Sequence, residues 1–193
     1  MKKMEKIIFI CVILLPGLLY AQSSASERAV HSAGNYTIGM GPVGNIYITD
    51  RRPEMDPGIG ALVFFDYRWA PELSTSATIM MLNQDGDDRD AGQSNIIFMG
   101  IPTFDIKYYW ITNPSRWDPF ASIGVGYYVV THGQRGLGLA SGMGAQIGAG
   151  FDYYITSRFS FGISGAFRSI ALLGSGSSGS FPLSVDGRFG FHF

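Results

Sequence analysis

The sequence predicts an all-β fold, an eight-stranded antiparallel up-and-down β-barrel that crosses a membrane, and three observations support this prediction. Apolar and polar residues alternate along eight stretches, each about ten residues long or more, which suits tilted strands that cross a bilayer. The segments between these stretches alternate between long and short. The last stretch, 182–193, keeps an aromatic face up to Phe193, as a strand does when one face meets lipid and the other a polar lumen.

The N-terminus has the composition of a secretory signal peptide. Three lysines precede an apolar run over residues 7–19, and a small residue, Ala21, follows it. A basic, an apolar and a small-residue segment in this order predict a cleaved signal peptide over residues 1–21, with cleavage after Ala25 as the second choice. Residues 22–34 are then expected to be a polar periplasmic lead-in, and residues 35–193 to form the outer-membrane barrel.

The alternation places the eight strands one after another along the barrel segment. Their predicted ranges are 35–49, 59–69, 73–82, 95–110, 117–131, 142–155, 158–170 and 182–193. Turns with proline, at 70–72 and 113–116, follow the second and fourth strands, and only residues 156–157 separate the sixth from the seventh. Longer segments follow the odd-numbered strands. Because barrels of the outer membrane have short periplasmic turns and longer external loops, we expect both termini in the periplasm.

Composition excludes several other function classes. After the signal peptide the chain keeps one lysine, Lys107, and ten arginines against fourteen acidic residues, and no basic patch predicts nucleic-acid binding. The single cysteine, Cys11, lies in the signal peptide, so no disulfide or thiol chemistry is expected. Residues 39–44 match the GxGxxG pattern, but Pro42 blocks the helix that dinucleotide binding needs. No metal or other cofactor is predicted.

Strand parity assigns a mostly apolar set of side chains to the external half of the lumen. These upper-lumen residues are Leu62, Phe64, Met80, Leu82, Ile97, Met99, Ile101, Tyr128, Val130 and Arg168. The same parity turns Ile96 and Phe98 outward, toward lipid. The upper-lumen residues either pack on each other and fill the barrel, or line a pocket for a small apolar molecule.

Charged side chains share the inward parity near the periplasmic ends of the strands. They are Asp66, Arg68, Asp105, Lys107, Asp152, Arg158, Asp186 and Arg188. Buried charges are tolerable when they are paired, so each of the four aspartates is expected to pair with one of the four cations and to close the lumen.

Aromatic residues near the same strand ends are predicted to face outward, at the boundary between lipid and water. They are Tyr67, Trp69, Tyr108, Trp110, Tyr153, Phe159, Phe191 and Phe193. Two prolines inside predicted strands, Pro42 and Pro102, each remove a ladder hydrogen bond. They mark either bulges or a sideways exit from the lumen into the membrane.

Two neighbouring stretches resemble a known family. Residues 100–110 carry Pro102-Thr103 and then alternate to an aromatic end, and residues 118–127 carry Pro119-Phe120 and then a glycine-containing run to a tyrosine. This pattern resembles the OmpW family, although Ser122 stands where the family has glycine, and the wider OmpA-like group of small barrels fits almost as well. The resemblance implies eight strands, an apolar upper channel closed below, and passage of small hydrophobic molecules.

These observations leave two functions open. The first is an outer-membrane barrel that binds or passively admits small hydrophobic molecules through its apolar upper lumen, closed below by ion pairs. The alternative is a structural or surface-interaction barrel with a filled lumen that acts through its external loops. An enzyme is not expected, because neither His132 nor His192 is placed beside a serine near the outer rim.

The expected partners follow from the predicted location in the bacterial outer membrane. They are outer-membrane lipid and lipopolysaccharide, a small hydrophobic ligand, and the barrel-assembly machinery, since the strand that ends in Phe193 resembles the assembly signal of such proteins. No nucleic acid is expected. The acidic loop 83–94 either stays solvated or holds divalent ions.

Overall fold

The computed structural model describes residues 34–48, 56–86, 94–110, 116–132, 140–173 and 178–193. The predicted signal peptide lies outside the described residues, as do the lead-in before Gly34 and most of the acidic loop, so these remain predictions. Within the part that the structure describes, no helix is long and apolar enough to span a membrane.

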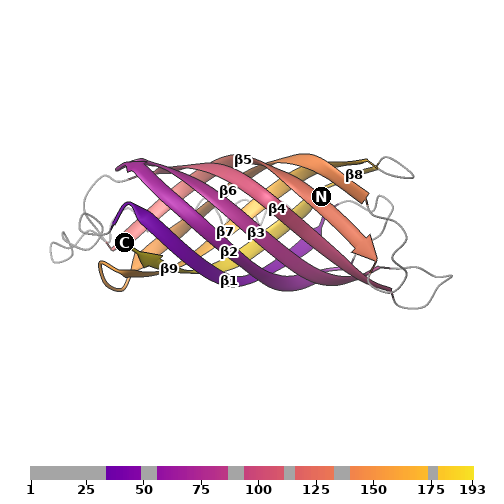
Figure 1. The fold of residues 1–193 in the computed structure, drawn as a ribbon, viewed down its shortest axis with the longest axis horizontal. Coiled ribbons are helices and arrows are strands. Elements are labelled where there is room, and N and C mark those ends of the chain that lie inside the picture. Colours follow the sequence, from indigo (N-terminus) through magenta and orange to yellow (C-terminus); the bar gives the residue numbers. More distant parts are fainter. Residues whose placement is uncertain (1–33, 49–55, 87–93, 111–115, 133–139, 174–177) are drawn as a thin grey trace, which may run out of the picture.

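The described residues form one closed antiparallel barrel (Figure 1). Its strands are β1 (Tyr36–Tyr47), β2 (Gly58–Ala70), β3 (Leu73–Gly86), β4 (Ser94–Tyr109), β5 (Trp117–His132), β6 (Ala140–Tyr154), β7 (Phe159–Leu173), β8 (Ser178–Ser180) and β9 (Pro182–His192). Each of the seven long strands β1 to β7 pairs with the next along the chain, β7 also pairs with β9, and β9 pairs with β1 to close the barrel. The predicted fold class is therefore confirmed, with the three-residue β8 as an addition.

The two ends of the barrel are named here by what lies there. Tyr36 and Phe193 lie side by side at the terminus end, where each backbone amide donates to the carbonyl of the other residue, at 3.1 and 2.9 Å. The C-terminus marks this end in Figure 1. Tyr47 of β1 and Gly58 of β2 lie at the opposite end, called the loop end. The strands cross between the two ends at a strong tilt (Figure 1), as closure of a small barrel requires.

Alternation along each strand separates a lipid-type outer face from a buried inner face. On β2, Val63, Phe65 and Tyr67 are exposed, whereas Leu62, Phe64 and Asp66, which alternate with them, are buried. The predicted aromatic residues near the terminus end are exposed as expected, except Tyr153, which is half-buried. A band of exposed apolar side chains closed on itself is the outer surface that a transmembrane barrel offers to lipid.

β4 departs from the predicted parity. Between Gly100 and Thr103, two residues of β4 stand opposite one residue of β3 and one of β5, which is a β-bulge. Pro102, which has no amide hydrogen for the ladder, lies in this bulge. The extra residue reverses the faces of the strand on its loop-end side. The bulge interpretation of Pro102 is confirmed, whereas Pro42 lies in unbroken register opposite Ala61.

The predicted strands 158–170 and 182–193 leave residues 171–181 between them as one of the longer connecting segments. Instead, β7 continues to Leu173, and β8 pairs with it through Ile170–Ser180 and Leu172–Ser178. β9 takes over the pairing with β7 from Leu183. Small residues are poor strand formers, so the pairing here is decided by the neighbouring strand rather than by the segment itself.

Candidate functional site in the barrel lumen

The loop-end half of the lumen is filled by one group of buried apolar side chains, called the apolar cluster. Its members are Val43, Leu62, Phe64, Met80, Leu82, Ile96, Phe98, Tyr128, Val130, Ile170 and Leu172. Phe98 and Tyr128 are 1% and 0% exposed, and their rings stack with centroids 5.6 Å apart. Fully burying a side chain of this size stabilises the fold by about 1.5–3 kcal/mol.

Most of the predicted upper-lumen residues are buried inside the barrel. Leu62, Phe64, Met80, Leu82, Tyr128, Val130 and Arg168 are at most 6% exposed. The inward placement of Ile97, Met99 and Ile101 is wrong: Ile101 is 39% exposed, and the other two are half-buried. Ile96 and Phe98 take the inner face in their place, because the bulge in β4 reverses the parity. A ligand-binding role for the set stays a prediction.

A polar network lies below the apolar cluster, toward the terminus end. The hydroxyl of Tyr128 donates to Gln146 Oε1 at 3.0 Å, and Arg168 Nε donates to the same oxygen at 2.8 Å. Gln146 Nε2 in turn donates to Asp105 Oδ1 at 2.6 Å. Arg168 also donates to the hydroxyl of Ser184. These side chains come from β4, β5, β6, β7 and β9 and tie one side of the lumen together.

The next layer is a compact group of charges, called the ion-pair cluster: Asp66, Lys107 and Arg188. Asp66 Oδ2 lies 2.6 Å from Lys107 Nζ and 2.8 Å from Arg188 Nη2. The Arg188 guanidinium lies 3.9 Å from the ring centroid of Phe64, and Lys107 Nζ lies 5.1 Å from that of Phe120. The Asp66 carboxylate and the faces of the two aromatic rings together replace the hydration that the two cations lose on burial.

Arg68 lies closer to the terminus end and pairs with an aspartate that the parity analysis did not include. Its Nη1 lies 2.6 Å from Asp118 Oδ2 and 3.3 Å from the Tyr154 hydroxyl. Its guanidinium covers the ring of Tyr109, 4.1 Å from the centroid. Asp118 has the same parity as Tyr128 on β5, so the signal for its inward position was present in the sequence.

Several predicted ion pairs do not form among the described residues. Asp105 bonds to Gln146, and Asp186 accepts from Ser164 at 2.7 Å, so both are held by neutral groups. Asp152 is buried, but no side chain of the described residues donates a hydrogen bond to its carboxylate. Arg158 is exposed at the turn between β6 and β7 and is not part of the lumen. The reason is its position beyond the last inward residue of β6, Tyr154.

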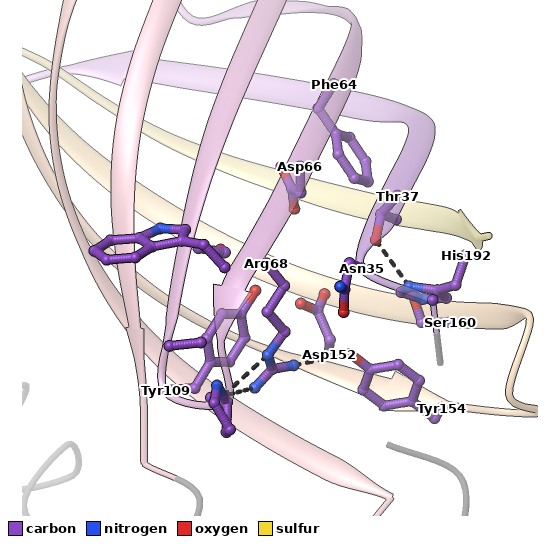
Figure 2. A pocket seen from close by; sticks show the side chains of 15 residues that line it. Asn35, Thr37, Phe64, Asp66, Arg68, Tyr109, Asp152, Tyr154, Ser160 and His192 are labelled. Carbon is purple, nitrogen blue, oxygen red and sulfur yellow. Dashed lines mark hydrogen bonds between the residues drawn. The ribbon is translucent and has the colours of Figure 1, made fainter. Parts of the chain in front are cut away.

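The terminus end of the lumen contains a cavity of about 230 Å³ (Figure 2), called the end cavity. Its lining includes Asn35, Thr37, Phe64, Asp66, Arg68, Ser74, Tyr109, Asp152, Tyr154, Ser160 and His192. The lining also includes residues of the β2–β3 turn, such as Pro71, so the cavity reaches the end of the barrel. It is polar where the loop-end half of the lumen is apolar.

His192 closes one wall of the end cavity and joins three strands. Its Nδ1 lies 2.8 Å from the Thr37 hydroxyl on β1, and its Nε2 lies 2.8 Å from the Ser160 hydroxyl on β7 (Figure 2). Tyr154 packs against the imidazole, with ring centroids 4.9 Å apart. Both ring nitrogens thus have a hydroxyl partner, as a buried histidine requires.

Some buried polar atoms around this region have no hydrogen-bond partner. Asp66 Oδ1, Ser74 Oγ, Ser76 Oγ and Arg188 Nε are unpaired, and Asp66 and Ser74 also line the end cavity. Among the described residues, no group of three His, Cys, Asp or Glu side chains is arranged to hold a metal ion. Unpaired buried donors and acceptors are costly unless a bound molecule or water satisfies them.

The fold is similar to those of known small barrels of bacterial outer membranes. Neisserial surface protein A aligns over 83% of this chain and 99% of its own, with a TM-score of 0.69 and 10% identity. OprG from Pseudomonas aeruginosa gives a TM-score of 0.56 at 16% identity, over 83% and 96% of the two chains. E. coli outer membrane protein W gives 0.52 at 16% identity, over 84% and 100%.

These comparisons establish the fold: an eight-stranded barrel of the kind found in OmpW and its structural neighbours. The expected resemblance to small outer-membrane barrels is therefore confirmed. At such low identities, the likeness does not extend to a ligand or an activity. No protein-family model and no curated protein matches the chain.

Proposed function

We propose that the protein is a bacterial outer-membrane barrel with a closed lumen, which acts through the surface and the loops that it presents. The observation that carries this proposal is the apolar cluster, whose inward side chains from six strands pack at 0–6% exposure. In the proposed orientation the terminus end faces the periplasm, and β1 to β7 and β9 cross the membrane.

Two layers with different chemistry support a closed lumen. A polar solute that entered from the loop end would have to displace apolar side chains, and it would then meet Asp66, Lys107 and Arg188 in mutual contact. Separating a buried ion pair leaves uncompensated charges, which costs about 3–5 kcal/mol. The two layers therefore oppose the passage of solutes along the barrel axis in different ways.

A second candidate function is binding or passive admission of small hydrophobic molecules. It is favoured by the composition of the apolar cluster, since an apolar guest would meet only apolar side chains and the ring of Tyr128 there. In this case the cluster would have to part to admit the guest. The packed arrangement makes this candidate weaker than the first.

Two measurements separate the candidates. In planar bilayers, the wild-type protein is expected to give no steady ionic conductance. Cells that express it are expected to take up an apolar fluorescent dye no faster than cells without it. The matching variants replace Leu62 and Met80, a cross-strand pair inside the barrel, with tryptophan, and the control variants replace the neighbouring outward pair Val63 and Ile79.

The outcome with these variants decides between the functions. If the wild type accelerates dye uptake, and the inward pair L62W/M80W abolishes this gain while the outward pair V63W/I79W keeps it, hydrophobic admission is correct and the closed barrel is wrong. A steady wild-type conductance would also overturn the closed lumen. Heat-modifiable migration on a gel verifies that each variant forms the barrel.

A further inference from the structure

We infer that the end cavity is a binding site for a small organic cation that carries a primary ammonium group, with the Asp152 carboxylate as its ionic partner. The inference does not depend on the proposed function, because a molecule can enter and leave the end cavity from the terminus end while the lumen above stays closed. It rests on three observations: unpaired buried polar groups, an excess of buried acidic side chains, and the size of the cavity.

The first observation is a set of buried polar groups without a hydrogen-bond partner. Asp66 Oδ1 and Ser74 Oγ are buried and unpaired, although both residues line the cavity and are 6% and 1% exposed. The Asp152 carboxylate, on another strand of the same cavity, receives no side-chain hydrogen bond from the described residues. A ligand that carries several donors can satisfy both carboxylates, and the serine hydroxyl can pair with either a donor or an acceptor of that ligand.

The second observation is the balance of charge inside the barrel. Five inward aspartates face four inward cations among the described residues, and the acids are Asp66, Asp105, Asp118, Asp152 and Asp186. The cations are Arg68, Lys107, Arg168 and Arg188. An uncompensated charge is expensive in a medium of low dielectric constant. One additional positive charge in the end cavity would balance this formal count of inward charges.

The cations that line or adjoin the cavity are already engaged. Arg68 is paired with Asp118, and it also donates to the carbonyl of Pro71. Lys107 and Arg188 share Asp66. Asp152 is thus the carboxylate of the cavity that has no ion-pair partner among the described residues. The available chemistry favours a cation over an anion.

An ammonium group fits this arrangement better than a metal ion does. It carries three donors and no acceptor, which matches carboxylate and hydroxyl acceptors. Divalent metal ions prefer several oxygen ligands converging on one point, and the described residues contain no such group of three. The cavity of about 230 Å³ holds several water molecules or one small amine, but not a lipid or a peptide.

The test uses ethanolamine as the probe and ethylene glycol as its neutral isostere, because both stay in water rather than entering detergent. The folded full-length barrel in micelles is titrated with each, and backbone amide chemical shifts are followed by NMR. Saturable shifts are expected around Tyr154, Ser160 and His192 with ethanolamine, and roughly tenfold weaker binding with ethylene glycol.

Two matched variants identify the binding group. Asp152→Asn keeps the shape of the side chain and removes its charge, and it is expected to weaken ethanolamine binding roughly tenfold or more. Glu72→Gln removes an exposed acid from the turn at the same end of the barrel and is expected to leave the affinity within about twofold. Ser74→Ala provides a second reporter inside the cavity, with a smaller loss.

Three results would overturn the inference. One is the absence of saturable shifts, which would mean that water alone occupies the cavity. Another is equal binding of ethanolamine and ethylene glycol. The third is equal weakening of ethanolamine binding by Asp152→Asn and Glu72→Gln, which would indicate general attraction to surface charge. In that case 0.5 M salt would abolish the chemical-shift changes, because surface charges are screened within about 10 Å already at 0.1 M.

Discussion

The two halves of the lumen are both filled by inward side chains, but those at the loop end are apolar and those at the terminus end are polar or charged. At the loop end, inward residues such as Met80, Leu82 and Phe98 are apolar and pack on each other at about 1% exposure. At the terminus end, inward residues such as Asp66 and Lys107 are charged and are held by ion pairs. Both halves are built from the same strands, and apart from the bulge in β4 the alternation runs through both, so the difference lies mainly in side-chain chemistry.

The two halves differ in whether their side chains need partners of defined geometry. Apolar side chains need no partner of a given geometry, so the apolar cluster satisfies itself. Charged and hydroxyl groups need partners at defined distances, and in the terminus-end half Asp66 Oδ1 and Ser74 Oγ lack them. The end cavity lies on the side where the internal partners are incomplete (Figure 2).

The largest expected effect comes from the centre of the ion-pair cluster. Asp66→Ala removes the carboxylate that both Lys107 and Arg188 contact, and it leaves two buried cations without that partner. We expect a loss of about 5 kcal/mol in the free energy of unfolding, the upper end for breaking a buried pair. Urea unfolding in lipid vesicles, followed by tryptophan fluorescence, measures the change. Exposed Glu72→Gln should change it by less than about 0.5 kcal/mol; equal losses would contradict the assignment.

The apolar half is tested on β4, where the structure reverses the predicted faces. Phe98→Ala empties part of the apolar cluster and should cost about 4 kcal/mol. Phe104→Ala lies on the same strand beyond the bulge, where the side chain is 54% exposed, and it should cost much less. If the exposed phenylalanine were the more sensitive one, the bulge would be misplaced.

β4 also shows how far sequence patterns reach. The alternation of apolar and polar residues is a local property, and it predicts the barrel and the inward set on β2 and β5 correctly. A bulge depends on the pairing with both neighbouring strands, and one extra residue between Gly100 and Thr103 turns Ile97, Met99 and Ile101 away from the predicted face. Pro102 was the visible signal, since proline in a strand marks edges and bulges.

Charge pairing was predictable in kind but not in detail. The sequence indicates inward charges near the terminus end, and most of them are buried. Which acid meets which cation depends on strand tilt and stagger, because partners such as Arg68 and Asp118 lie on strands that are not neighbours. The two-to-one sharing of Asp66, and the absence of a close ion pair to Asp152 among the described residues, follow from that geometry rather than from parity.

An intermediate effect is expected on the outer face, which both halves share. Val125 is 54% exposed and pairs with Phe104 of β4 and Ala145 of β6. In the proposed orientation this position lies near the middle of the bilayer, where an arginine on the lipid face costs about 3 kcal/mol. Val125→Arg should therefore lower stability in lipid vesicles by this amount. An unchanged unfolding midpoint would mean that this face does not contact lipid.

The smallest effect on stability is expected for Arg158→Ala, which tests where the charged half of the lumen ends. The side chain was predicted to belong to the lumen, but it is exposed at the β6–β7 turn. Among the described residues, the hydrogen bonds of Arg158 are made by its backbone: its amide donates to the Thr156 hydroxyl at 3.2 Å, and its carbonyl accepts from the amide of His192 at 2.8 Å. Alanine keeps both bonds, so the change in unfolding free energy should stay within about 0.5 kcal/mol.

Arg188→Ala, measured alongside, should lose several times more, because it removes a buried cation from Asp66. Similar losses of unfolding free energy for the two variants would indicate that the Arg158 side chain lies inside the lumen.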